Sequence, residues 1–292
     1  MALTSGKVKL PLGVTTTLLN KVRDTSVIAA LSPSVPQKFA DQTYMVFNPS
    51  SEAEVVAEGA KKGSYEQTLT PVEAKRVKVV TTTRVSDELT WADEQNQLEI
   101  IKNILVDQNG AIARALDYVV LHGINPKTGE AIADMPALSA RAAQVTKGDD
   151  PTADIDKLTD ALIDWDINGF ALSRSFASEL RKLRVPATGQ RLYPEIPLSL
   201  GAGSVDGIPA AVSGTVNGRV AKEATNVEAF MGDWSLIKWG MVRDIWSEVI
   251  EYGDPDGTGV DLKNVNQVAY RTEAVLGFAI LDPAGFAVLK SA

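Results

Sequence analysis

The sequence predicts an α+β fold, and three features carry that prediction. A ribbon with period-two alternation, a long stripe of helical spacing and a strand-rich final third follow one another along the 292-residue chain. Apolar residues at every second position are typical of strands, whereas recurrence every three to four positions is typical of a helix. Hydrophobic residues make up 45% and charged residues 23%, which is the balance of a folded globular protein.

The ribbon is predicted over residues 52–86, as two extended arms around a flexible tip at 60–64. One face of the returning arm carries Val77, Val79, Thr81, Thr83 and Val85. The other face carries Lys78, Thr82 and Arg84, and the pair Lys75-Arg76 shifts the alternation as a β-bulge would. An isolated two-stranded hairpin is marginal in water, so we expect this ribbon to lie on another copy of the chain. The alternative is an ordinary hairpin folded back on its own domain.

Residues 1–51 are predicted to form an arm rather than a domain. Prolines and glycines break the segment into extended pieces that are too small to bury a core, with a short helix expected over 15–22. Such an arm would drape over another surface. The alternative is a loosely ordered terminus.

The helical stripe predicts one long helix over residues 97–122, after an acidic entry at 87–94. Its buried face is expected to consist of Leu98, Ile101, Leu105, Ile112, Leu116 and Val119. Gly123 stands where a C-cap glycine ends a helix. At 1.5 Å per residue such a helix would be roughly 40 Å long, which suits an elongated subunit.

The middle of the chain predicts a second module. Asp150 and Pro151 have the residue types of a helix start, Asn168-Gly169 ends that helix, and a short strand over 170–172 leads to a helix capped by Ser173 or Ser175. An irregular stretch over 185–207 follows. In the final third, residues 241–252 are predicted to pair with residues 264–273.

Residue types that perform chemistry are scarce. The chain has no cysteine and one histidine, which excludes disulfides, thiolate metal sites and most nucleophilic triads. We interpret His122 as a cation at a helix C-terminus, where the macrodipole stabilises it. Asp254, Asp256 and Asp261 lack the spacing of a calcium loop and are interpreted as a solvated turn. The sequence therefore predicts no enzyme, no cofactor and no metal.

Two further groups have structural explanations. Asp160, Asp164 and Asp166 are expected on the solvent side of the second helix. The tryptophans Trp234, Trp239 and Trp246 are interpreted as core or interface anchors rather than as stacking platforms for bases, because few basic residues are interleaved with them.

The net charge of −8 argues against a protein that grips nucleic acid through phosphates, because such binders need clustered Lys and Arg. No apolar run reaches the roughly 18 to 20 residues of a spanning helix, and the N-terminus lacks the apolar stretch of a secretory signal. We therefore expect cytoplasmic synthesis and no membrane contact.

The order of these parts resembles the major capsid proteins of tailed bacteriophages, which share the Hong Kong 97-type fold. The resemblance covers nearly the whole chain and rests on the segments Ala53-Glu54-Val55-Val56-Ala57-Glu58-Gly59-Ala60-Lys61, Arg84-Val85-Ser86-Asp87-Glu88-Leu89, Ala113-Arg114-Ala115-Leu116-Asp117, Asp233-Trp234-Ser235, Glu251-Tyr252-Gly253-Asp254-Pro255 and Asp282-Pro283-Ala284-Gly285-Phe286.

The resemblance implies a division into four parts. These are an N-terminal arm (1–51), an extended β-hairpin loop (52–86), a peripheral domain with the spine helix and a sheet (87–150 and 238–273), and an axial domain (151–237 and 274–292). The loop residues expected at contacts between subunits are Lys61, Lys62, Tyr65, Arg76, Lys78 and Arg84. We match no partner for the Lys-Asn crosslink of some relatives, and assign no catalytic residue.

The resemblance also implies partners. The chain would self-assemble into pentamers and hexamers of an icosahedral shell that encloses double-stranded DNA without sequence-specific binding. Because no large charged helical extension precedes the arm, a separate scaffolding protein is expected, together with a portal. The protein would be assembled in the host cytoplasm and end in the virion. The alternative is an encapsulin-like nanocompartment shell, whose members typically begin with a helix rather than a proline-broken arm.

Overall fold

The computed structural model describes residues 25–35, 42–48, 53–64, 68–96, 99–218 and 225–291. Its helices are α1 (Val27–Leu31), α2 (Asp87–Asn96), α3 (Ile100–Asp117), α4 (Leu138–Arg141), α5 (Pro151–Asp160) and α6 (Arg174–Lys182), with a π-helical turn η2 (Tyr118–His122) and 3-10 turns η3 (Trp234–Leu236), η4 (Lys263–Val265) and η5 (Pro283–Gly285). Its strands are β1 (Thr43–Asn48), β2 (Thr68–Glu73), β3 (Lys75–Ser86), β4 (Ala143–Thr146), β5 (Gly169–Leu172), β6 (Ser204–Val205), β7 (Ile208–Val212), β8 (Val227–Gly232), β9 (Ile237–Ile250), β10 (Gln267–Ile280) and β11 (Phe286–Lys290). Helices and largely antiparallel sheets confirm the predicted α+β class.

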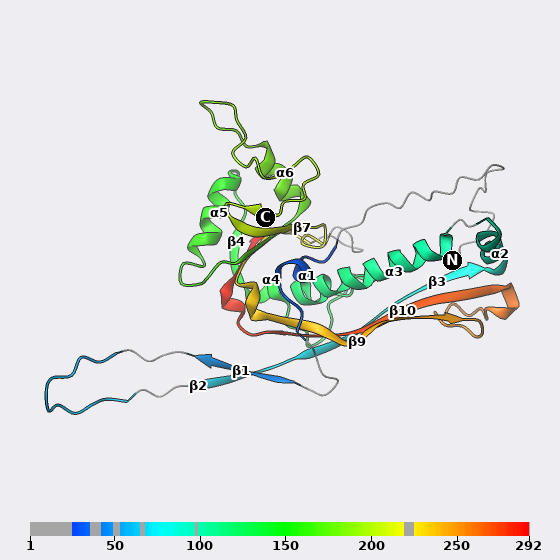
Figure 1. Ribbon diagram of the computed structural model, residues 1–292, viewed down its shortest axis with the longest axis horizontal. Helices are drawn as coiled ribbons and strands as arrows, with labels where there is room; N and C mark the ends of the chain where they lie inside the picture. Colours follow the sequence, from blue (N-terminus) through cyan, green and yellow to red (C-terminus); the bar gives the residue numbers. More distant parts are fainter. Residues whose placement is uncertain are drawn as a thin grey trace.

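A long antiparallel sheet with the order β3-β10-β9 forms the lower body of the molecule (Figure 1). Helix α3 runs along one face of it. The predicted pairing of 241–252 with 264–273 is confirmed for 246–250 with 269–273, and the ladder continues to the pair Ile237↔Ile280. Residues 263–265 instead form the turn η4. The alternation of β3 is confirmed as well, because Val77 and Val79 pack against the core while Lys78 is exposed.

A mixed sheet with the order β4-β11-β8-β5-β7-β6 forms the second module. Successive side chains of a strand point to opposite faces, so strands β5, β7, β8 and β11 each contribute to two cores. Ala229 and Met231 of β8 pack with α5 and α6, whereas Phe230 packs with η2 and β10. The second of these cores joins the two modules and includes Trp234, which is fully buried as predicted.

The predicted helix over 97–122 is confirmed from Ile100 to His122, where its last turn is π-helical and Gly123 ends it. The predicted acidic entry at 87–94 is itself a separate helix α2, and Glu99 adopts a left-handed conformation (φ 55°) between α2 and α3. The Asp93 carboxylate accepts hydrogen bonds from the N–H groups of Ile100 (2.8 Å) and Ile101 (3.2 Å), which caps α3. Helix α3 continues through Gly110, and Leu98 lies outside the described residues.

The helix ends of the second module follow the sequence closely. The Asp150 side chain accepts from the Thr152 N–H with Pro151 at the first position, and the Ser173 hydroxyl accepts from the Phe176 N–H at 3.0 Å. Helix α5 nevertheless ends at Asp160, and turns fill the chain up to Gly169. Asp160, Asp164 and Asp166 are exposed, as predicted, and the stretch 185–207 is largely irregular.

Most of the predicted N-terminal arm, including the helix expected over 15–22, lies outside the described residues. Of its described residues, 25–35 lie against the junction of the two modules, whereas 43–48 form strand β1. Its helix α1 contacts β5, β7 and α3, and the Trp239 indole N–H donates to the Ser32 carbonyl at 2.9 Å.

Candidate assembly surface

A two-stranded ribbon of β1 and β2 projects from the body at the end opposite α2 (Figure 1). The projecting loop therefore spans residues 43–73 rather than the predicted 52–86. Strand β3, which was predicted as its returning arm, pairs with β10 within the body sheet, because its apolar face is covered by α3. For this half, the alternative of a strand folded back on its own domain is the one observed.

The predicted bulge at Lys75-Arg76 is also wrong, since both residues keep a regular register with β10. The break lies one residue earlier, at Ala74 between β2 and β3, where the Ala74 N–H donates to the Gln42 carbonyl at 2.8 Å. This contact sets where the ribbon leaves the body sheet.

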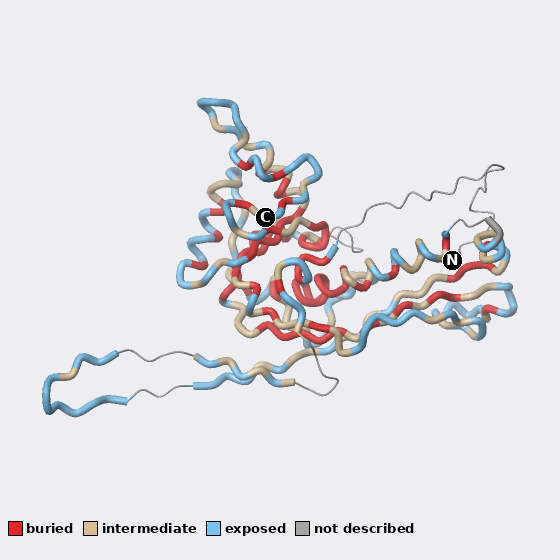
Figure 2. Tube along the Cα trace, viewed as in Figure 1, coloured by how far each residue is buried: buried red, intermediate tan, exposed pale blue. Residues whose placement is uncertain are grey.

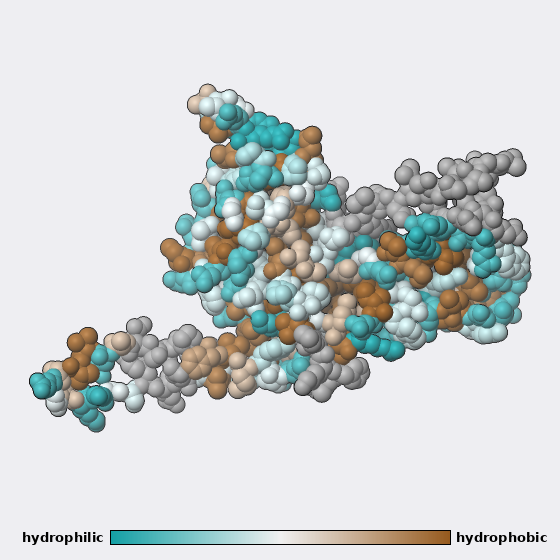
Figure 3. Space-filling view, viewed as in Figure 1, coloured by the Kyte–Doolittle hydropathy of each residue, from teal (hydrophilic) through white to brown (hydrophobic). Residues whose placement is uncertain are grey.

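One face of the ribbon is apolar and open to solvent. Phe47 pairs with Leu69 and Met45 pairs with Pro71, so the four side chains lie together on that face. Met45, Phe47 and Leu69 are 57%, 51% and 56% exposed. Figure 2 shows exposed and intermediate residues along this part, and Figure 3 shows hydrophobic residues along it. We call these four side chains the β1–β2 apolar face. No other described residues form a layer that covers it.

The tip of the loop is a small closed turn. The Glu54 carboxylate accepts from the Gly63 N–H at 2.9 Å, and the Ala60 N–H donates to the Ala57 carbonyl at 3.0 Å. Gly59 takes a positive φ of 77°, which suits glycine because it has no Cβ. Val55 is fully exposed at the tip.

The base of the ribbon holds an open hollow of about 610 Å³. Its lining carries three basic side chains, Lys75, Arg76 and Lys78, beside Glu73 and Gln42. The Lys78 ammonium lies 2.8 Å from the Glu273 carboxylate of the neighbouring strand. A basic hollow on a chain of net charge −8 favours acidic protein surfaces as neighbours.

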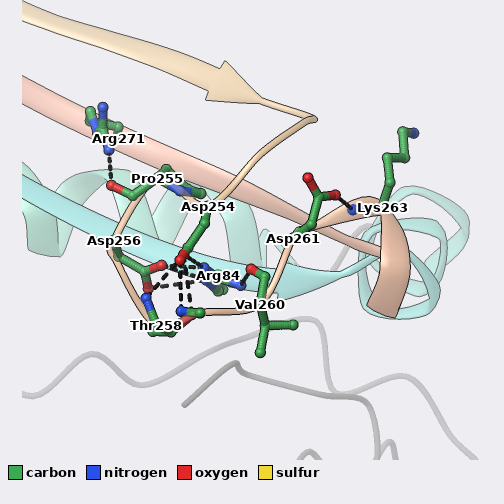
Figure 4. Close-up of polar contacts among 10 residues, drawn as sticks. Arg84, Asp254, Pro255, Asp256, Thr258, Val260, Asp261, Lys263 and Arg271 are labelled. Carbon is green, nitrogen blue, oxygen red and sulfur yellow. Dashed lines mark hydrogen bonds and ion pairs between the residues drawn. The ribbon is translucent and has the colours of Figure 1, made fainter.

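Arg84 occupies a different setting from the one predicted, because it is only 7% exposed. Its guanidinium donates to Asp254 (2.5 Å), to Asp256 (2.8 Å from Nε) and to the Val260 carbonyl (3.0 Å), all in the turn between β9 and β10 (Figure 4). The Asp256 hydrogen bond raises the pKa of Arg84, so the group stays charged. Arg84 thus clamps that turn within its own chain.

The carboxylates of Asp254, Asp256 and Asp261, whose spacing is not that of a calcium loop, have partners within the chain. Arg84 supplies the positive charge that Asp254 and Asp256 face, while Asp261 accepts from the Lys263 N–H at 2.9 Å. Within the described residues, no group of three metal-ligating side chains is found. In the same residues, no helix is long and apolar enough to cross a bilayer.

A buried carboxylate anchors the described N-terminal segment to the body. Asp117, at the end of α3, accepts from the Ser26 hydroxyl (2.6 Å), the Val27 N–H (2.9 Å), the Ile28 N–H (3.2 Å) and the Thr215 hydroxyl (2.5 Å). Burial raises the pKa of Asp117 to about 6, although these hydrogen bonds lower it in part. The anion thus caps α1 and fixes where the segment enters.

His122 is not the helix-end cation that we predicted. Burial lowers its pKa to about 4, so the ring is neutral at neutral pH. Its Nε2 atom lies 3.1 Å from the Thr215 carbonyl, and Phe230 packs edge-on against the ring. The prediction fails because the cost of burying a charged imidazolium exceeds the stabilisation that the helix macrodipole would give it.

The structure places five of the six predicted contact residues, in three settings. Lys61 and Lys62 are exposed at the tip, Arg76 and Lys78 lie at the base on β3, and Arg84 is buried. Tyr65 lies outside the described residues. The sequence reasoning missed the β1–β2 apolar face, although the run Tyr44-Met45-Val46-Phe47 is a strand-like signal.

These features leave an uncovered apolar face and exposed charges on a projecting ribbon, which is the kind of surface that other chains can cover. A family model described as the phage capsid family matches residues 6–291, and the chain belongs to this family. It is a major capsid protein of the tailed-phage type. No curated protein sequence matches it.

Solved structures agree with the family. A chain of Mycobacterium phage Ogopogo is 35% identical with a TM-score of 0.86, over 100% of both chains. A chain of Gordonia phage Cozz is 28% identical with a TM-score of 0.82, over 99% of this chain and 93% of that one. A capsid chain of an empty GTA particle shares the fold at 14% identity and a TM-score of 0.62, over 99% and 97%.

The predicted Hong Kong 97-type fold and capsid function are thereby confirmed. The family and these neighbours are shell proteins rather than enzymes, and they favour a phage capsid over the encapsulin alternative.

Proposed function

We propose that this subunit closes into pentamers and hexamers of an icosahedral shell, with its projecting ribbon lying over a neighbouring copy. The β1–β2 apolar face carries the proposal. A two-stranded ribbon is marginal alone, and side chains such as Phe47 each gain about 1.5 to 3 kcal/mol when removed from water. A second copy can supply the missing cover, and repeated head-to-tail contacts of this kind close into rings.

The contacts of each subunit would be shared among several neighbours. Lys61 and Lys62 at the tip and Arg76 and Lys78 at the base are the proposed polar contacts around the apolar face, with Tyr65 as the remaining candidate. Arg84 would affect these contacts only indirectly, because its guanidinium pairs with Asp254 and Asp256 in the turn between β9 and β10. Many weak contacts acting together stabilise a shell through multivalency.

The proposed cargo is double-stranded DNA, held by confinement rather than by adhesion. The net charge of −8 supports this, because a strongly basic wall would bind phosphates and hinder packing and release. A separate scaffolding protein and a portal are proposed partners on the family resemblance alone. Assembly would take place in the host cytoplasm before the protein resides in the virion.

The division into parts remains a proposal. With β3 counted in the body sheet, the peripheral domain would comprise 74–150 and 238–273 instead of 87–150 and 238–273, and the axial domain 151–237 and 274–292. The arm and loop would meet near residue 43, where β1 begins. The boundary at 273/274 falls within β10, beside the register shift between Glu273 and Val275.

The test is Phe47→Asp, with Phe47→Leu as the matched apolar control. We expect Phe47→Asp to keep the melting temperature of the unassembled chain but to lose shells in negative-stain microscopy and sedimentation velocity. Phe47→Leu should assemble. Normal shells from Phe47→Asp would refute the placement of the ribbon on a neighbour.

A further inference from the structure

The tip of the projecting loop carries two lysines without an ion-pair partner among the described residues. The exposed Lys61 and Lys62 make no ion pair with any described carboxylate, and the nearby Glu54 is held by the Gly63 N–H. Beside them Val55 presents a completely exposed apolar side chain. Elsewhere among the described residues, Lys147 pairs with Glu179 and Lys157 pairs with Asp154. The tip therefore places an exposed apolar side chain beside two exposed positive charges.

Helix α2 carries the complementary set. Leu89 is buried, while Glu88, Trp91 and Glu94 are exposed at spacings of three residues, which places them along one ridge. Trp91 is 58% exposed, and neither glutamate forms an ion pair with a described residue. We call this the α2 ridge. The helix has no basic residue of its own, so the acidic charge is not offset locally.

These two surfaces are complementary in charge and in apolar character. Exposed tryptophans are typical anchors of protein interfaces, and a lysine ammonium over an indole face gains cation–π attraction. Two flanking carboxylates add to that attraction. Because the ribbon and α2 lie at opposite ends of the long sheet (Figure 1), the two surfaces of one copy are separated, and a head-to-tail contact between copies can join them.

A rival acceptor exists on the second module. Ile163 is 81% exposed and is flanked by the exposed Asp160 and Asp164. It offers an apolar side chain and negative charge, but no aromatic face for an ammonium group. The π-system of Trp91 favours the α2 ridge, since cation–π attraction requires one.

We propose that the loop tip, through Val55, Lys61 and Lys62, docks on the α2 ridge of a second copy. This rests on the proposed function, in which the ribbon lies over a neighbour, and it names the acceptor on that neighbour. The contact joins an apolar centre to a charged rim, the usual anatomy of a specific interface.

The absence of cysteine from the chain allows a direct test. Ser64→Cys places a thiol at the exposed tip without altering the proposed contact residues, and a benzophenone maleimide attached there captures whatever lies near it on irradiation. In assembled shells, we expect peptide mapping to find intermolecular adducts within residues 87–96. Adducts confined to 160–166 or to another element would overturn the α2 acceptor and leave the ribbon contact intact. Assembled shells without intermolecular adducts would refute both.

Charge reversal gives an independent readout. Lys61→Glu with Lys62→Glu should raise the subunit concentration needed for assembly roughly tenfold, since a few weak ion pairs become repulsive. Adding Glu88→Lys and Glu94→Lys should restore assembly, whereas adding Asp160→Lys and Asp164→Lys should not. All these side chains are exposed, so the melting temperature of the unassembled chain serves as the folding control. Restoration by the second pair instead of the first would assign the contact to the rival surface.

Discussion

The ribbon and the six-stranded sheet differ in how far the apolar side chains of their strands are exposed to solvent. Phe47 of β1 is 51% exposed, whereas Phe230 of β8 is fully buried between the two modules. Both lie in alternating or apolar strands of six residues. The difference teaches that a strand pattern identifies a face that needs cover, while the source of the cover is decided elsewhere. In the sheet the chain covers itself; in the ribbon we propose that another copy does.

The largest expected effect comes from truncating the two phenylalanines in the unassembled chain. Phe230→Ala should lower the free energy of unfolding by about 3 to 5 kcal/mol, because it leaves a cavity in the joining core. Phe47→Ala should change it by about 0.5 kcal/mol or less, as for an ordinary surface substitution. Urea unfolding measures both. Equal losses would mean that the ribbon is packed within its own chain.

The pH dependence of stability should arise from two buried groups of the body. His122 has a folded pKa of about 4, below its unfolded value, so its contribution is present above pH 6.5 and is lost as the pH falls through 4. Asp117 has a folded pKa of about 6, above its unfolded value, so its contribution is present below pH 3.8 and is lost as the pH rises through 6.

Because these two contributions oppose each other, single variants should reveal them. From pH 4 to 6.5 the parent chain should gain about 3 kcal/mol relative to His122→Gln, and should lose a similar amount relative to Asp117→Asn. Urea unfolding at several pH values provides the comparison. Parallel curves for parent and variants would show that neither group titrates in this range. Phe47→Ala is the matched control and should leave the pH profile unchanged.

The smallest effect is expected at the junction of ribbon and body. Lys78 is an exposed partner of Glu273, so Lys78→Ala should cost about 1 kcal/mol or less in the unassembled chain. Arg84→Met, six residues further along β3, should lower the melting temperature more, because it leaves the carboxylates of Asp254 and Asp256 without their positive partner. Thermal unfolding ranks the two. A larger loss of melting temperature for Lys78→Ala than for Arg84→Met would contradict the stabilising role given to the ion pairs of Arg84 with Asp254 and Asp256.

Local signals in the sequence predicted many element ends correctly. Asp150 with Pro151, Ser173 and Gly123 each determine a cap through their own side chain or lack of one, so no distant residue is needed. The alternation of β3 was likewise readable. The failures are those in which a distant partner decides: Arg84 seemed to lie on a solvent face until Asp254 and Asp256 were brought to it by the turn.

His122 illustrates the same limit. Its position before Gly123 is a local fact, but its neutrality follows from burial beneath β8 and from the Thr215 carbonyl, which lies 93 residues away. The projecting loop shows it too. Period-two spacing identified β3 as a strand, yet only the pairing with β10 removed it from the ribbon and left β1 and β2 to project.

The sequence by itself determined the fold class, the order of parts and the caps of several helices, because those depend on neighbouring residues and on spacing. Only the tertiary structure decided which apolar faces are covered and which charges are buried. Pairing between distant strands sets both, and the backbone hydrogen bonds that make such pairs carry little sequence information.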